Sequence, residues 1–138
     1  MSFRLVLLKF EIMKFAKYVF YVAGVYGIIA LLPQYFLESK NGADFPPAIT
    51  HAEYYYGFIG VGLAFQIVFL IIGSDPQKYR QMIIPSIVEK FSFAVALVVL
   101  YLQNRLAPLM LGLGFIDMTL GVLFIASYFA LSAEARTK

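Results

Sequence analysis

Four long apolar stretches alternate with short polar segments along the chain. They cover residues 15–34, 52–73, 83–103 and 107–131. A helix rises about 1.5 Å per residue, so each stretch is long enough to cross a hydrocarbon core about 30 Å thick. Lipid offers no partner to a bare backbone amide, so spans of this length must be helical. The pattern therefore predicts an all-α fold, a bundle of four transmembrane helices.

Short polar patterns indicate how the spans begin. Thr50 and Glu53 have the spacing of a capping box, in which each side chain binds a backbone amide at a helix start. Asp75 and Pro76 are typical of the N-cap and first position of a helix, so they predict a short interfacial helix before the third span. Residues 1–14 place apolar side chains on one helical arc, which favours an interfacial helix ahead of the first span.

The composition agrees with a membrane protein and excludes several other classes. The chain is 62% hydrophobic and 14% charged, whereas soluble domains are roughly half apolar and about a quarter charged. This excludes a soluble globular enzyme, a disordered tail and a nucleic-acid module. The length of 138 residues allows a single integral membrane domain, residues 1–138. The chain has no cysteine, which excludes disulfides, thiolate metal sites and cysteine nucleophiles.

The basic residues predict the orientation in the membrane. If both termini lie inside, only Lys40 and Arg105 of the 11 basic residues fall on the outer side, and Lys90 lies within a span. Lysine and arginine concentrate in cytoplasmic segments, so we expect both termini in the cytoplasm. The pI of about 9.1 then reflects topology rather than a nucleic-acid partner.

Three polar side chains fall well inside the spans, namely Gln66, Glu89 and Asp117. The helical rise places Gln66 and Glu89 at nearly the same level, with Asp117 near the midplane. Small residues share their helix faces, which indicates close packing around a polar layer in the inner half of the bundle. Lys90 follows Glu89 by about 100° around the helix, so we expect it to leave that face and snorkel to the inner interface.

This polar layer has two interpretations. Polar groups inside lipid are expensive unless they are paired or hydrated. Gln66, Glu89 and Asp117 could therefore form a hydrogen-bond network that sets the register of the bundle. Alternatively, they could form a site that titrates a proton or binds a ligand. The sequence leaves both interpretations open.

Aromatic residues at the outer end of the second span form another candidate site. His51, Tyr54, Tyr55, Tyr56 and Phe58 would line an outer cavity, if the helices leave one. Aromatic walls with one or two polar groups suit a lipid, a quinone or a pigment. No resident cofactor, metal or catalytic group is predicted, because a lone interfacial histidine is usually solvated and the serines near the membrane edges lie opposite it.

Motifs spread over residues 51–131 carry a resemblance. They are Glu53-Tyr54-Tyr55-Tyr56-Gly57-Phe58-Ile59-Gly60, Asp75-Pro76 with Tyr79-Arg80, Val88-Glu89-Lys90-Phe91, and Gly114 with Asp117. This pattern is similar to small uncharacterised bacterial membrane proteins with four spans, which look broadly DoxX-like in size and span number. The first span lacks the arginine- and lysine-containing pattern of DoxX itself. The resemblance implies the architecture and a bacterial inner membrane, and no activity.

Three functions are compatible with these observations. The first is a non-enzymatic binding or accessory subunit, in a homo-oligomer or a larger membrane complex. Its polar layer would stabilise the bundle or bind a lipid, a quinone or a protein partner. The second is a small oligomeric transporter or channel in which Glu89 and Asp117 relay protons or cations. The third is a membrane-embedded enzyme with the same two residues as acid and base, although we expect them at different depths, about one turn or more apart.

Overall fold

The computed structural model describes residues 3–136, which form five α-helices and two short 3-10 helices. Four helical segments are long and apolar enough to cross a membrane: Val6–Phe36, Ala52–Ser74, Arg80–Leu102 and Pro108–Ala133. No strand occurs within residues 3–136. The predicted all-α four-helix architecture is therefore confirmed.

The first span is longer than the sequence indicates. Helix α1 (Phe3–Leu31) runs without a break through the segment that we expected to be separate from the span. A 3-10 helix, η1 (Leu32–Phe36), follows it with a proline near its start. Residues 3–14 are thus the first turns of α1, and residues 1 and 2 of the predicted interfacial segment lie outside the described residues.

The predicted capping box is wrong. Helix α3 (Ala52–Ser74) begins one residue later than that motif requires, with His51 at the N-cap and no side-chain hydrogen bond to the cap. Glu53 then stands at the second helical position, where its carboxylate cannot reach back to the N-cap amide. Its Oε1 instead lies 3.0 Å from Nδ1 of His51. The two side chains pair with each other at the exposed end of the helix.

The short helix predicted at Asp75-Pro76 is also wrong. Asp75 is the C-cap of α3, and its Oδ1 accepts a hydrogen bond of 3.1 Å from the backbone amide of Lys78. Aspartate commonly forms such local turns, which compete with helix initiation. A 3-10 helix, η2 (Arg80–Met82), follows this turn and leads directly into α4 (Ile83–Leu102).

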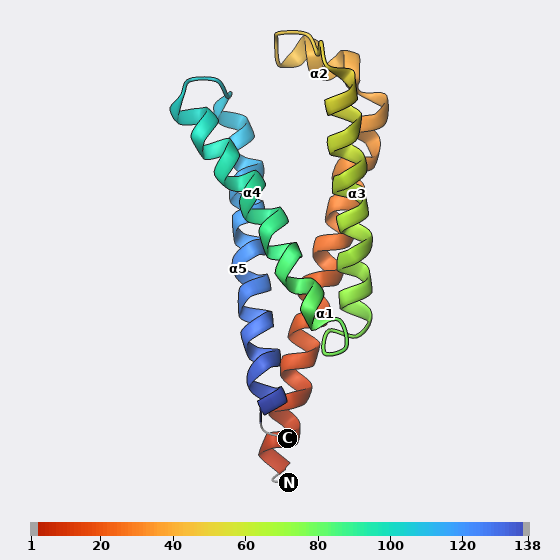
Figure 1. Ribbon diagram of the computed structural model, residues 1–138, viewed down its shortest axis with the longest axis vertical. Helices are drawn as coiled ribbons and strands as arrows, with labels where there is room; N and C mark the ends of the chain where they lie inside the picture. Colours follow the sequence, from red (N-terminus) through yellow and green to blue (C-terminus); the bar gives the residue numbers. More distant parts are fainter. Residues whose placement is uncertain (1–2, 137–138) are drawn as a thin grey trace.

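The helices form two arms that diverge toward one end (Figure 1). We call the pair α1 and α3 the first arm, and the pair α4 and α5 (Pro108–Arg136) the second arm. The arms meet mainly where α1 packs against α5, while α3 and α4 touch over a short stretch. Both termini lie at the end where the arms converge, and α2 (Glu38–Asp44) lies at the far end of the first arm.

An aromatic core joins the arms near the convergent end. Phe20 of α1, Phe69 of α3 and Phe124 of α5 are all fully buried. The rings of Phe20 and Phe124 stack with centroids 4.3 Å apart, and Phe69 meets Phe124 edge-on at 5.0 Å. Lipid gives no hydrophobic driving force between helices, so such packing contacts hold the arms together.

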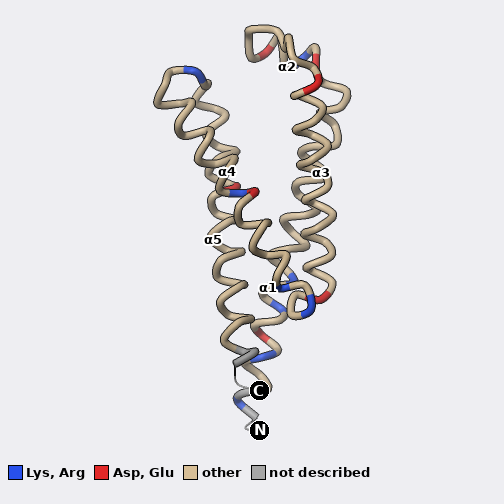
Figure 2. The backbone as a smooth tube through the Cα atoms, in the orientation of Figure 1, with Lys and Arg blue, Asp and Glu red and all other residues tan. Residues whose placement is uncertain are grey.

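Charged residues follow a simple distribution. Figure 2 shows most of them near the two ends of the molecule, with one group midway along the second arm. That group is formed by Glu89 and Lys90 of α4 and Asp117 of α5. The charges at the ends face polar surroundings in any bilayer, so the midway group is the one that needs a structural explanation.

Candidate functional site

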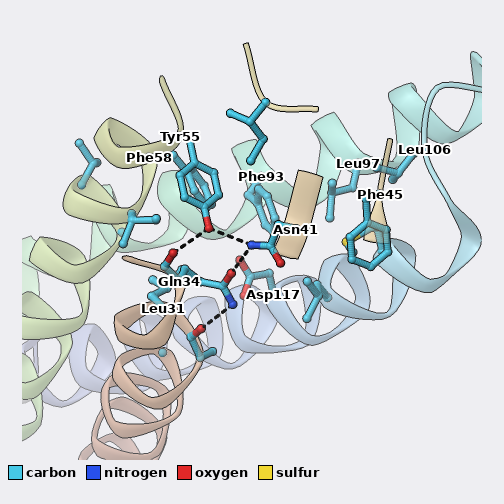
Figure 3. A pocket seen from close by; sticks show the side chains of 18 of the residues that line it. Leu31, Gln34, Asn41, Phe45, Tyr55, Phe58, Phe93, Leu97, Leu106 and Asp117 are labelled. Carbon is cyan, nitrogen blue, oxygen red and sulfur yellow. Dashed lines mark hydrogen bonds between the residues drawn. The ribbon is translucent and has the colours of Figure 1, made fainter. Parts of the chain in front are cut away.

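A cavity of about 1040 Å³ lies between the two arms. Every α-helix contributes to its lining, from α2 and the following loop at one end to the charged group on α4 and α5 at the other. Figure 3 shows side chains of both arms pointing into this space. The cavity exists because the arms diverge from the aromatic core, while α4 and α5 stay in close contact with each other.

Lys90 is the centre of the charged group. Its Nζ donates a hydrogen bond of 3.1 Å to Oδ1 of Asp117 and lies 3.3 Å from Oε2 of Glu89. The residue is only 4% exposed. Its ammonium also lies 5.2 Å from the ring centroid of Phe69, within cation–π range. Lys90 therefore connects both helices of the second arm to α3 of the first arm.

The expected snorkelling of Lys90 is wrong. The expectation considered α4 alone, on which Lys90 and Glu89 point about 100° apart. In the structure the flexible lysine stem carries the ammonium back to both carboxylates, one of them 27 positions away in the chain. A buried cation is far less costly when it is paired than when it is isolated in lipid.

The two carboxylates meet at one site. Glu89 and Asp117 contact the same ammonium nitrogen at 3.3 and 3.1 Å, so the difference in depth that we expected does not keep them apart. Glycine in α5 permits the close approach of the two helices that this requires. A Cβ atom at Gly121 would meet the ring of Phe91 at 2.7 Å, closer than Cβ atoms approach other atoms in proteins.

Gln66 lies in the same cavity but outside this ion group. It is 1% exposed, and its Nε2 donates a hydrogen bond of 2.8 Å to the carbonyl of Gly62, one turn earlier in α3. Its Oε1 has no hydrogen-bond partner among the described residues. This oxygen lies against Gly27 of α1, where a Cβ atom would overlap it. The predicted layer of polar residues therefore divides into an ion group and a separate amide with a free acceptor.

The middle of the cavity is aromatic. Phe58 of α3 and Phe93 of α4 face each other across the two arms, with ring centroids 5.6 Å apart. Tyr26 of α1 lines the same space. Tyr26 and Phe93 were not singled out from the sequence, since aromatic residues are frequent throughout the spans.

A hydrogen-bond cluster holds α2 against the first arm at the wide end of the cavity (Figure 3). Nδ2 of Asn41 donates to Oε1 of Gln34 at 2.7 Å and to the hydroxyl of Tyr55 at 2.8 Å. The Tyr55 hydroxyl donates in turn to the carbonyl of Gln34 at 2.7 Å. Sequence reasoning missed Gln34 and Asn41, because only the folded chain brings them to Tyr55.

The five residues predicted at the outer mouth separate into two groups. Tyr55 and Phe58 line the cavity. His51 and Tyr54 are exposed outside it, and their rings contact each other. Tyr56 does not line the cavity, and its hydroxyl donates a hydrogen bond of 2.7 Å to Glu38. Within the described residues, no three His, Cys, Asp or Glu side chains are grouped to hold a metal ion.

Comparisons of the chain with models of protein families, with curated proteins and with solved structures give no match. The resemblance to DoxX-like proteins therefore stays a prediction.

Proposed function

We propose that this protein binds a lipid-soluble molecule, of the size and amphipathic character of a lipid or quinone, in the cavity between its two arms. In this proposal it is a non-enzymatic binding protein or the binding subunit of a larger membrane complex. The observation that carries the proposal is the cavity itself. It combines an apolar, aromatic middle with one charged end formed by Glu89, Lys90 and Asp117.

The dimensions and chemistry of the cavity support this function. Small-molecule sites are clefts of about 300–1,000 Å³ with mostly apolar walls and a few polar groups that fix orientation. The cavity of about 1040 Å³ slightly exceeds the top of that range. A molecule with its polar end at the charged end would place its apolar part against Phe58 and Phe93. Because α3 and α4 pack together only briefly, we propose that the molecule enters between them from the bilayer.

The proposal includes an orientation in a bacterial inner membrane. Both termini lie at the convergent end of the arms, and many of the basic residues gather at that end (Figure 2). Cytoplasmic segments carry an excess of lysine and arginine, which favours the cytoplasm for this end. The wide end of the cavity, with α2 beside it, would then face the outer side.

Filling the cavity is expected to remove the bound molecule. Ala30 lines the cavity from α1, so Ala30→Trp should occupy the space that the ligand needs. Native mass spectrometry of the wild-type protein in mild detergent should show a lipid-soluble molecule at fixed stoichiometry, and an absorbance scan identifies a quinone or pigment. We expect the molecule to be absent from Ala30→Trp.

Ala64→Trp is the matched control, because Ala64 is exposed on α3 and does not line the cavity. This variant should keep the molecule. A wild-type protein that carries nothing, or equal retention in both variants, would contradict the proposal.

The ion group favours a second candidate function, a small transporter with a proton or cation relay. Two carboxylates share one buried ammonium in the cavity wall, an arrangement common on ion pathways. If Glu89→Gln and Asp117→Asn fold normally and abolish flux in proteoliposomes, the relay is supported. If they change only thermal stability, the group is structural. Proximity alone does not favour the enzyme hypothesis, since both carboxylates are already paired with Lys90.

A further inference from the structure

The ion group contains two carboxyl groups and one ammonium group. Glu89 and Asp117 both pair with Lys90, and no other basic side chain of the described residues is paired with either of them. Lys90 can balance one negative charge. The group is electrically neutral only when it gains a second positive charge, carried by a proton or by a bound cation. Neutrality matters here because an unbalanced charge inside a low-dielectric region is energetically costly.

Glu89, Lys90 and Asp117 all line the cavity. The side chains are 18% exposed for Glu89, 12% for Asp117 and 6% for Lys90. The ammonium of Lys90 lies 3.1 Å from Asp117, 3.3 Å from Glu89 and 5.2 Å from the ring centroid of Phe69. Two carboxylates share this one ammonium, so the charged end of the cavity carries net negative charge when both are ionised.

Gln66 provides a second and independent observation. Its Oε1 is buried in the same wall and lacks a hydrogen-bond partner among the described residues. The amide cannot be reversed to remove this free acceptor, because its nitrogen already donates to the carbonyl of Gly62. An unsatisfied buried acceptor is unfavourable until a donor reaches it. The wall thus offers acceptors and negative charge, and both are complementary to a ligand that carries positive charge and donors.

The aromatic middle of the cavity fits the same kind of ligand. Tyr26, Phe58 and Phe93 line it, and the faces of aromatic rings attract cations. A negatively charged head would be repelled by the two carboxylates. A neutral head would leave the second negative charge to be balanced by a proton.

We propose that the ligand is an amphipathic cation, with an apolar body between the arms and a single positively charged head beside Glu89 and Asp117. This inference rests on the proposed function, since it specifies the class of lipid-soluble molecule that the cavity binds. The head replaces the proton that would otherwise complete the charge of the group. Amines and quaternary ammonium or phosphonium compounds with apolar substituents belong to this class.

Tetraphenylphosphonium and tetraphenylborate provide a direct test, because they have nearly the same size and shape and opposite charge. Their binding is measured by equilibrium dialysis against the full chain in nanodiscs of zwitterionic lipid, with empty nanodiscs subtracted. We expect saturable binding of the phosphonium, at least about tenfold tighter than that of the borate, as for other close charge pairs at partly buried sites.

Neutralising either carboxylate should remove this selectivity. Glu89→Gln and Asp117→Asn each leave one carboxylate to pair with Lys90, so the fold should be retained. We expect each variant to bind the phosphonium about tenfold more weakly. Glu53→Gln is the matched control, since Glu53 is an exposed carboxylate outside the cavity, and it should bind like the wild type.

The outcomes test the cationic ligand separately from the proposed function. Equal binding of the two ions, or unchanged phosphonium binding in both neutralised variants, overturns the cationic head. If that binding is nevertheless lost in Ala30→Trp, the cavity still binds lipid-soluble molecules and the proposed function stands. If neither ion binds and no molecule is carried by the purified protein, both proposals fail. The comparison of the two ions on the wild-type protein holds even if a variant does not fold.

Discussion

Replacing Lys90 with methionine is expected to lower the free energy of unfolding by about 3–5 kcal/mol, the usual result of removing one partner from a buried ion pair. Methionine keeps most of the side-chain volume and loses the ammonium. Glu89 and Asp117 would then be buried together without a cation. The contact with Phe69 would also be lost, so α3 would be held less firmly against the second arm.

The unfolding of this variant is measured by circular dichroism during titration with SDS in mixed micelles, since the chain has no tryptophan to report by fluorescence. Lys78→Met is the matched control, because Lys78 is exposed in the turn between α3 and α4. This substitution should lower the free energy of unfolding only slightly. The triple variant that adds Glu89→Gln and Asp117→Asn to Lys90→Met should recover most of the loss. If Lys90→Met proves as stable as Lys78→Met, the ion group does not hold the fold.

Replacing Phe124 with alanine is expected to destabilise the protein by about 3–5 kcal/mol, as is typical of phenylalanine truncation in a packed core. Phe124 stacks on Phe20 and meets Phe69 edge-on, so it connects α5 to both helices of the first arm. Its removal leaves a void at the place where the arms meet. We expect the arms to separate more readily and the cavity to lose its fixed width.

Phe129→Ala is the control for this experiment. Phe129 lies on the same helix and is 66% exposed, so its truncation removes a lipid-facing ring and leaves no internal void. The same SDS titration should show a much smaller change, within the range of ordinary surface substitutions of about 0.5 kcal/mol. Equal losses in the two variants would show that the aromatic core does not join the arms.

The positions of the spans were predictable because they depend on local composition. The second span was expected at residues 52–73 and is α3, Ala52–Ser74. The third was expected at residues 83–103 and is α4, Ile83–Leu102. Lipid accepts only long apolar helices with internally satisfied backbones, so hydropathy and length are sufficient to locate them.

The connecting segments were less predictable, because their structure depends on contacts made elsewhere. Helix α2 has no apolar periodicity, so the hydrophobic pattern does not predict it. It is held by Asn41, which reaches Gln34 and Tyr55 over 7 and 14 positions of the chain. Short helices of this kind are marginal by themselves and need tertiary contacts.

The sequence indicated which polar residues belong to the candidate site, but not how they are arranged. Gln66, Glu89 and Asp117 are in the cavity wall, as expected of polar residues inside a membrane bundle, and Lys90, which was expected at the inner interface, lies there with them. The sequence did not show that Lys90 would turn inward, that both carboxylates would share it, or that Gln66 would stay apart. Each of these depends on where α5 and α1 cross their neighbours.

The sequence by itself determined that the chain is a bundle of four apolar helices, where those helices lie, and which polar residues enter them. These properties follow from the free energy of each segment in lipid, which is a local quantity. Only the tertiary structure decided which polar groups meet and that a cavity remains between the arms. Pairing and cavity shape depend on the crossing of separate helices, here set by the stacked rings of Phe20 and Phe124 and the close contact of α4 with α5.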